Sequence, residues 1–200
     1  MGFGAMHLAG FGPVAAAART AALIERLTPQ RVLLIGIAGA YDTSRHPVGS
    51  ALVFDRVALH GVGAGEGADF LGPPALGFPQ WPAQGETQAI EDELPLAVPH
   101  GIDRVGRAPL LLTTTAASAT AEQANECLRR FPAAAAEDME GFAVAFACAL
   151  AHIPLAIARG ISNPVGERNP ARWNIPLALA AALRAARGAL EQPHWEPPRT

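Results

Sequence analysis

Short apolar runs alternate along the chain with longer alanine-rich stretches of mixed polarity, a pattern that predicts strands alternating with helices. The run at 31–35 is apolar after its first residue, as expected for a strand covered on both faces of a sheet. The same reasoning predicts strands at 31–35, 51–59, 109–115 and 155–161, and helices at 14–27, 119–130, 138–151 and 174–190. The sequence therefore predicts an α/β fold with a mostly parallel central sheet flanked by helices.

Two segments show neither the periodicity of a helix nor that of a strand. Residues 61–101 are rich in glycine and proline, and we expect them to form a long surface excursion, which at this length is usually functional or disordered. The proline-rich residues 192–200 predict a loose tail. The chain contains no internal repeat and no linker, so we expect one domain over residues 1–191.

The amino-acid composition excludes several kinds of chemistry. All fifteen basic residues are arginines, which excludes Schiff-base chemistry, lysine-held pyridoxal phosphate and the lysine of a phosphate-binding loop. Cys127 and Cys148 are too few for a four-thiolate zinc site or a disulfide framework, and we expect no metal or other cofactor. The net charge of −3 argues against a nucleic-acid partner.

The most apolar stretch, residues 142–158, is interrupted by His152 and Pro154 and is shorter than the roughly 20 residues that a bilayer requires. It predicts a buried helix, a turn at the proline and a buried strand. The residues up to Leu8 have no basic flank and too short an apolar run for a signal peptide. We therefore expect a cytoplasmic protein without a membrane partner that acts on a small molecule.

In folds of this class, binding sites lie where strands end and helices begin, which selects three junctions at 36–41, 137–141 and 159–174. The first junction is a glycine-punctuated turn whose small residues let a ligand approach the backbone N–H groups. Glycine serves a plain turn equally well, so both interpretations of this junction stay open.

The second junction carries three carboxylates, Glu137, Asp138 and Glu140, ahead of an apolar helix. Negative charge at a helix N-terminus is favourable by about 0.3–1 kcal/mol per acid, which accounts for one or two of them. A carboxylate at this turn is also suited to accept both hydroxyls of a sugar cis-diol. At the third junction, Arg159 lies next to an apolar strand and requires an anionic partner if it is buried, for which Asp138 and Glu140 are candidates.

Ser162 and Asn163 follow at the end of that strand, either as caps of its backbone or as ligand groups. Four motifs occur in order: Gly10-Phe11-Gly12, Gly36-Ile37-Ala38-Gly39, Glu137-Asp138-Met139-Glu140-Gly141 and Arg159-Gly160-Ile161-Ser162-Asn163. In this order and spacing, over about residues 9–190, they resemble the nucleoside phosphorylase and nucleosidase superfamily. Together with Ala68-Asp69-Phe70-Leu71-Gly72 and Arg172-Trp173, they are most similar to the futalosine hydrolases.

The resemblance implies a three-layer phosphorylase/hydrolase-like fold and an N-glycosyl hydrolase that releases hypoxanthine from futalosine in menaquinone biosynthesis. It implies two catalytic residues: Glu140, which would bind the 2′- and 3′-hydroxyls of the ribosyl group, and Asn163, which would engage the purine. The implied substrate-binding residues are Ile37, Ala38, Gly39, Ala117, Ser118, Met139, Arg159 and Trp173. Met139 with the segment at Ala117 would wall the sugar and base, and Arg159 would orient the acidic group.

Particular side chains indicate which base leaves and which nucleophile attacks. Superfamily members that cleave 6-aminopurine nucleosides usually carry an aspartic acid at the position of Asn163, whereas an amide offers donors to N7 and to a 6-oxo oxygen. Leu34 and Ile37 stand where family phosphorylases carry an arginine and a serine for phosphate, so we expect water to be the nucleophile. Trp173 is suited to stack on an aromatic 5′ substituent, or it packs as a cap over the last helix.

The carboxylate of that substituent is expected to pair with Arg168 or Arg172. Family members open with a strand that ends in a glutamate, which activates the attacking water. Gly10 already matches a point well inside a typical member, and no residue before it is acidic, so we expect the coding sequence to begin upstream of Met1.

Two alternatives stay open. One is another purine nucleosidase or phosphorylase of the same fold, acting on methylthioadenosine, adenosylhomocysteine or inosine. The other is a paralogue that binds a purine nucleoside without turnover. In each case the expected partner is a small-molecule purine nucleoside, and the resemblance implies a homo-oligomer, a dimer or larger, with residues 61–101 as a contact.

Overall fold

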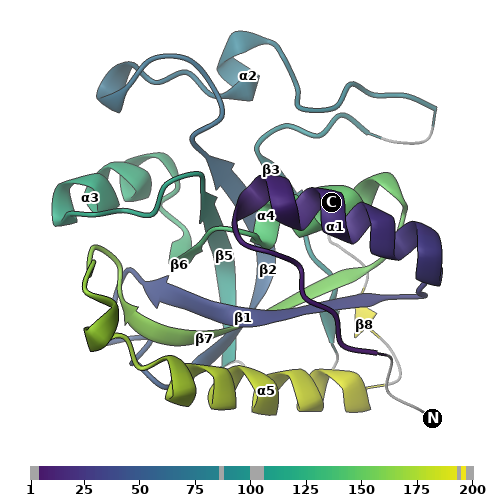
Figure 1. Ribbon diagram of the computed structural model, residues 1–200. Coiled ribbons are helices and arrows are strands. Elements are labelled where there is room, and N and C mark those ends of the chain that lie inside the picture. Colours follow the sequence, from purple (N-terminus) through teal and green to yellow (C-terminus); the bar gives the residue numbers. More distant parts are fainter. Residues whose placement is uncertain (1–4, 86–87, 100–105, 193–194, 197–200) are drawn as a thin grey trace.

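The computed structural model describes residues 5–85, 88–99, 106–192 and 195–196, and it places a mixed sheet between helices (Figure 1). Within these residues, six strands form the sheet in the order β3-β2-β5-β6-β1-β7. They are β1 (Val32–Ala40), β2 (Ala51–His60), β3 (Glu93–Pro95), β5 (Arg107–Thr114), β6 (Ala134–Asp138) and β7 (Leu155–Pro164). Because β7 also pairs with β2, all of these strands except β3 close into a ring.

The longer pairings in this ring are parallel. β1 runs parallel to β7, and β5 runs parallel to both β2 and β6. The antiparallel pairings of β1 with β6, β2 with β3 and β2 with β7 are shorter. The predicted α/β fold, with a mixed central sheet and flanking helices, is confirmed. Its closure into a ring is an additional feature that no local pattern indicates.

Helices cover the sheet on opposite sides. α1 (Gly12–Leu27) packs on α4 (Gly141–Leu150) on one side, and α5 (Ile175–Glu191) lies against β7 and β1 on the other (Figure 1). α5 approaches β7 closely at Gly160, where an added Cβ would lie 1.9 Å from the carbonyl oxygen of Ala178. α3 (Ala121–Arg130) connects β5 to β6, and the short α2 (Pro73–Leu76) belongs to the excursion.

The predicted helix at 138–151 is wrong at its start, because residues 134–138 form strand β6 and the helix begins only at Gly141. Alanine is depleted in strands, so the alanine run gave no strand signal. In the structure these small residues are buried on both faces, between β5 and β1. The remainder of the apolar stretch divides as predicted, into α4, a turn at His152 and Pro154, and β7.

The predicted turn at 36–41 is also wrong, since β1 continues to Ala40. Gly36 is required there by a neighbour rather than by a turn. An added Cβ at Gly36 would lie 1.8 Å from Nη1 of Arg159, which is its register partner in β7. The glycine therefore leaves room for a buried guanidinium to cross the strand.

The excursion at 61–101 is partly built into the body of the protein. β3 pairs with β2, and the N–H of Leu96 donates to the carbonyl of Asp55 at 2.8 Å, which buries the residues that follow β3. Residues 86–87 and 100–101 of this segment lie outside the described residues.

The segment 192–200, expected to be a loose tail, contains the short strand β8 (Trp195–Glu196), which pairs with β4 (Val98–Pro99). The indole N–H of Trp195 donates to the carbonyl of Ala189 at 3.1 Å. This pairing corrects the expectation for these two residues, while residues 193–194 and 197–200 lie outside the described part of the chain.

In the described ranges, no helix combines the length and the apolar character that crossing a membrane requires.

Candidate functional site

The ends of three strands meet at Gly39. This residue is the register partner of Glu137 in β6 and of Asn163 in β7. The structure therefore brings the second and third sequence junctions to the same end of the ring, on either side of the first. An added Cβ at Gly39 would lie 3.2 Å from Nδ2 of Asn163, so only a very small residue fits here without displacing the amide.

Asp138, the last residue of β6, holds the turn that leads into α4. Its carboxylate accepts a hydrogen bond from Oγ1 of Thr113 at 2.6 Å and one from the N–H of Gly141 at 3.0 Å. The predicted role of an acid at a helix N-terminus is therefore filled by Asp138. Glu140, although it stands at the N-cap position of α4, makes no capping bond.

Arg159 is the charge partner of Asp138. Its Nε and Nη2 donate to Oδ2 of Asp138 at 2.9 and 2.5 Å, and both side chains are almost fully buried. Nη2 also lies 3.7 Å from Oε2 of Glu140. The expectation that a buried Arg159 needs an anionic partner is confirmed: Asp138 is the bonded partner, and Glu140 is a second, longer contact.

Glu140 is oriented from two directions. Its Oε1 accepts a hydrogen bond of 2.9 Å from the N–H of Gly12, at the start of α1, while its Oε2 faces Arg159. Its side chain remains 17% exposed, in contrast to that of Asp138 at 1%. Because an ionised carboxylate has about four lone-pair sites, Glu140 keeps the capacity to accept further hydrogen bonds. Met139, beside it, is half-buried.

Asn163 lies in β7 and is buried. Its Oδ1 accepts a 2.6 Å hydrogen bond from the hydroxyl of Ser162, and its Nδ2 donates to the carbonyl of Pro164 at 2.9 Å. The Ser162 hydroxyl also lies 3.3 Å from the carbonyl oxygen of Ala38 in β1. Of the predicted residues in β1, Ala38 is buried, whereas Ile37 and Gly39 are half-buried.

Ser118 is tied to a buried carboxylate. Its N–H and its hydroxyl donate to the two oxygens of Glu137, both at 2.7 Å, and the hydroxyl of Tyr41 donates to Oε2 at 2.8 Å. Burial, followed by the charge of Glu137, raises the pKa of Tyr41 above its ordinary value. Glu137 thus anchors the turn that contains Ala117 and Ser118 to the end of β1.

Sequence reasoning missed this Glu137 network. The carboxylate was recognised as one of three acids, but its partners come from segments far away in the sequence. The available signal was the tyrosine that directly follows the glycine-containing strand, because a buried phenol requires a hydrogen-bond partner.

Trp173 and the arginines near it lie on the loop after β7. The Trp173 indole N–H donates to the carbonyl of Glu167 at 2.9 Å, and the Glu167 carboxylate pairs with Arg172 at 2.9 Å. The N–H of Asn174 donates to the carbonyl of Ser162 at 2.9 Å, which holds the end of this loop beside β7. Arg168 is exposed. The substrate contacts expected of these side chains stay predictions.

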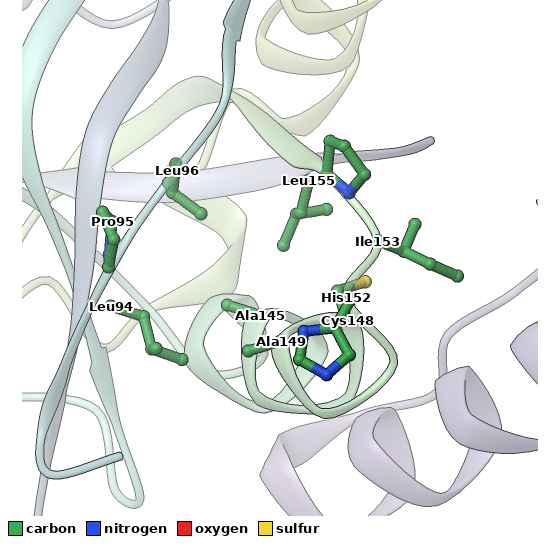
Figure 2. Close-up of a pocket in the computed structure, with 10 residues that line it drawn as sticks. Leu94, Pro95, Leu96, Ala145, Cys148, Ala149, His152, Ile153 and Leu155 are labelled. Atoms are coloured by element: carbon green, nitrogen blue, oxygen red, sulfur yellow. The ribbon is translucent and has the colours of Figure 1, made fainter. Parts of the chain in front are cut away.

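A cavity of about 310 Å³ lies elsewhere, between β3, the end of α4 and the start of β7. Figure 2 shows its largely apolar lining, to which Leu96, Cys148 and Leu155 contribute. None of the predicted site residues lines it, and Leu155 stands at the opposite end of β7 from Asn163. Across the described ranges, no group of three or more histidine, cysteine, aspartate or glutamate side chains is placed to hold a metal ion.

Known proteins resemble this chain in sequence and in fold. Residues 5–191 match the family model described as the Phosphorylase superfamily. The chain is 36% identical over 185 residues to the futalosine hydrolase of Streptomyces coelicolor, covering 88% of this chain and 74% of that protein. It is 34% identical over 154 residues to the 5′-methylthioadenosine/S-adenosylhomocysteine nucleosidase of Staphylococcus saprophyticus, covering 77% of this chain and 65% of that protein.

A solved structure shares the fold. The nucleosidase of the same name from Neisseria meningitidis, in complex with methylthio-immucillin-A, superposes with a TM-score of 0.72 at 21% identity. The superposition covers 92% of this chain and 79% of that one.

Proposed function

The chain belongs to the phosphorylase superfamily, and we propose that it is a nucleosidase that hydrolyses futalosine and releases hypoxanthine. The match to the family model confirms the family resemblance that the sequence motifs indicate. N-glycosyl hydrolysis of a purine nucleoside is the activity that the names of the two relatives share, which supports the hydrolase class for this protein. The futalosine substrate, and a place in menaquinone biosynthesis, are the finer part of the proposal.

The observation that carries the choice of leaving base is the orientation of Asn163. Its amide oxygen is occupied by Ser162 and one amide N–H by Pro164. Among the described residues Nδ2 has no second acceptor, so one N–H remains for a purine. Such a donor suits N7 or the oxygen of a 6-oxopurine, and it stabilises negative charge that develops on the departing base.

The ribosyl group is assigned to Glu140. Two hydroxyls on adjacent ring carbons both donate, and a partly exposed carboxylate accepts both in charge-assisted bonds. The bond from Gly12 and the proximity of Arg159 hold this carboxylate before the sugar arrives. Preorganisation of this kind is favourable because the carboxylate loses little further freedom when the substrate binds.

Water is the preferred nucleophile because, among the described residues, the side chains at the positions where family phosphorylases bind phosphate offer no cation. Leu34 and Ile37 are apolar, and the buried guanidinium of Arg159 is already neutralised by Asp138. A phosphate ion would therefore lose its hydration without gaining a charged partner.

We do not assign activation of that water to Glu137, Asp138 or Glu140. Within the described residues, Glu137 accepts bonds from Ser118 and Tyr41, and Asp138 is bound by Arg159. Glu140 is reserved for the sugar. The general base that the family resemblance implies stays a prediction.

Three features bear on the finer choice between futalosine and methylthioadenosine. The likeness to the Staphylococcus saprophyticus nucleosidase favours methylthioadenosine or adenosylhomocysteine. An asparagine at position 163 opposes an adenine leaving group, and Arg168 is exposed and has no ion-pair partner in the described part of the chain. Because Arg172 is already paired with Glu167, Arg168 is the better candidate for the carboxylate of futalosine.

An Asn163→Asp variant tests this assignment with a substrate panel of futalosine, inosine and methylthioadenosine, each with and without phosphate. We expect the wild type to prefer futalosine without phosphate, and the variant to shift toward methylthioadenosine. Asn169→Asp is the matched control, because that amide lies on an exposed loop and only caps Ala171. A wild-type preference for methylthioadenosine would refute the futalosine proposal, and hypoxanthine binding without any turnover would favour the non-catalytic alternative.

A further inference from the structure

We propose that Glu137 is a specificity-determining residue that accepts a hydrogen bond from N1–H of the purine, so that the site selects a 6-oxopurine over a 6-aminopurine. This inference rests on the proposed function, because that function assigns the purine to Asn163. It adds a second purine contact from the other side of Gly39, made by a carboxylate outside the set of predicted site residues.

Glu137 and Asn163 lie on the same face of the sheet, on either side of β1. Both are register partners of Gly39, and register partners in adjacent strands point their side chains to the same face. Because neighbouring strands are about 4.8 Å apart, roughly 10 Å separates the two backbones. Nδ2 of Asn163 lies 3.2 Å from the position that a Cβ of Gly39 would take, so the amide leans across the glycine toward the side of Glu137. The N–H that remains on Asn163 therefore shares a face with the carboxylate, with no side chain at Gly39 between them.

The carboxylate of Glu137 keeps one acceptor position in the described structure. Its Oε2 accepts the hydroxyls of Ser118 and Tyr41, whereas its Oε1 accepts only the N–H of Ser118. Since each carboxylate oxygen has two lone pairs, Oε1 retains one. Ser118 is also among the residues that the family resemblance assigns to substrate binding, which puts this acceptor beside the expected purine. The amide of Asn163 donates to Pro164 and not to Glu137 within the described residues, so the donor and the acceptor both remain for a ligand.

Glu137 is buried without a cation. It is 6% exposed and makes no ion pair in the described part of the chain, whereas Asp138, which is also buried, is bonded by Arg159. Successive residues of a strand point to opposite faces, so this guanidinium lies on the face opposite to Glu137. A buried anion is costly unless donors surround it. N1–H of a 6-oxopurine is a donor that would add to the three that Glu137 already has.

The donor and the acceptor match the hydrogen-bonding pattern of one class of purine. A 6-oxopurine presents acceptors at N7 and O6 and a donor at N1–H, whereas a 6-aminopurine presents a lone pair at N1. In the 6-oxo compound, Asn163 donates to the acceptors and Glu137 accepts from N1–H. In the 6-amino compound, the N1 lone pair faces the carboxylate and neither gains a hydrogen bond. We expect this mismatch to lower the specificity constant by roughly 10- to 100-fold relative to the 6-oxo compound.

The test compares futalosine with its 6-amino analogue as substrates of the purified protein. Glu137→Met keeps a similar volume and removes the acceptor, so the ratio of kcat/KM for futalosine to that for the 6-amino analogue should fall roughly 10- to 100-fold. In Glu137→Gln, the N–H of Ser118 holds the amide oxygen at the position of Oε1, so an uncharged acceptor remains. We expect the ratio in this variant to fall only about fivefold. Glu137→Gln alone decides the matter if Glu137→Met does not fold.

Tyr41→Phe is the matched control. It removes one donor to the same carboxylate and leaves the contact of Oε1 unchanged. The variant therefore disturbs the hydrogen bonds around Glu137 without removing the acceptor. We expect its substrate ratio to equal that of the wild type.

An equal loss on both substrates in the Glu137 variants would overturn the proposal, because it would indicate that the carboxylate only holds the turn at Ser118. An unchanged ratio, or the same fall in Tyr41→Phe, would overturn it as well. If the wild type releases no purine from either compound, the proposed function fails, and the ratio of the Kd values for hypoxanthine and adenine then tests the inference in the same variants. A Kd ratio that the Glu137 variants leave unchanged, or no binding of either base, contradicts it.

Discussion

Arg159 reaches from β7 past β1 and donates two hydrogen bonds to a single carboxylate oxygen of Asp138 at the end of β6. The pair joins two strands that are not neighbours in the sheet, since β1 lies between them. It also fixes the turn that presents Met139 and Glu140. The candidate site is therefore held by a buried ion pair rather than by the loops around it.

Replacement of Arg159 by methionine should destabilise the protein by about 3–5 kcal/mol, because Asp138 is left buried without its cation. Equilibrium unfolding in urea measures the change. The control is Arg172→Met, since that guanidinium is 72% exposed and should contribute less than about 1 kcal/mol. Equal effects of the two substitutions would contradict the importance of the buried pair.

The passage of Arg159 across β1 depends on Gly36. Gly36→Ala should lower the free energy of unfolding by about 1–3 kcal/mol, because the new methyl group overlaps the guanidinium. Gly188→Ala is the matched control: it lies in α5 with open space around the added Cβ, so it should stabilise the helix by about 0.5–1 kcal/mol. Thermal or urea unfolding of both variants distinguishes crowding from a general effect of glycine replacement.

The role of Glu140 in holding the sugar predicts a dependence on the ribosyl hydroxyls. Glu140→Gln should lower kcat/KM for futalosine by about 10- to 100-fold, because hydrogen bonds to a charged acceptor become bonds to a neutral amide. Removal of the 2′-hydroxyl from the substrate should then cost less in the variant than in the wild type. If the two losses simply multiply, Glu140 does not contact that hydroxyl.

The single tyrosine of the chain gives a specific pH dependence. The pKa of Tyr41 is raised in the folded state by burial and by Glu137, so the stability linked to it is fully present below the unfolded pKa near 10 and is lost as pH rises above it. The loss should approach about 1.4 kcal/mol per pH unit. Tyr41→Phe should remove this slope between pH 10 and 11, measured against the wild type, and an identical slope in the two proteins would contradict it.

Both thiols should be unreactive in the folded protein. Burial raises the pKa of Cys148 to about 12 and also raises that of Cys127. Because the thiolate is the nucleophile, a disulfide reagent at pH 8 should react slowly with the native protein and rapidly with both cysteines after unfolding. Rapid reaction of either native thiol would show that its surroundings are more open than the structure indicates.

The elements that local patterns predict are those with branched apolar side chains or clear helical periodicity. The strands that contain Val32 and Ile157 are examples, whereas β6 was missed because Ala134, Ala135 and Ala136 have little strand preference of their own. The ring closes through pairing of Ala51 with Gly160, which depends on the whole topology and not on either segment.

Some features of the candidate site could likewise be predicted from the sequence, and others could not. A partner for Arg159 was predictable, since a buried guanidinium demands an anion wherever it lies. The orientation of Asn163 was not, because it depends on the Pro164 carbonyl and on a hydroxyl whose direction is set partly by Ala38 in another strand. The order of the motifs indicated the family, while the donor and acceptor pattern of the site depends on contacts between strands that are distant in the sequence.

Hydrolysis of futalosine in phosphate-free buffer made with ¹⁸O-labelled water tests the central claim most directly. The account predicts that the purified protein releases hypoxanthine, that the label enters the ribosyl product, and that added phosphate does not change the rate. Release that requires phosphate, or an absence of hypoxanthine release above the uncatalysed background, would contradict it.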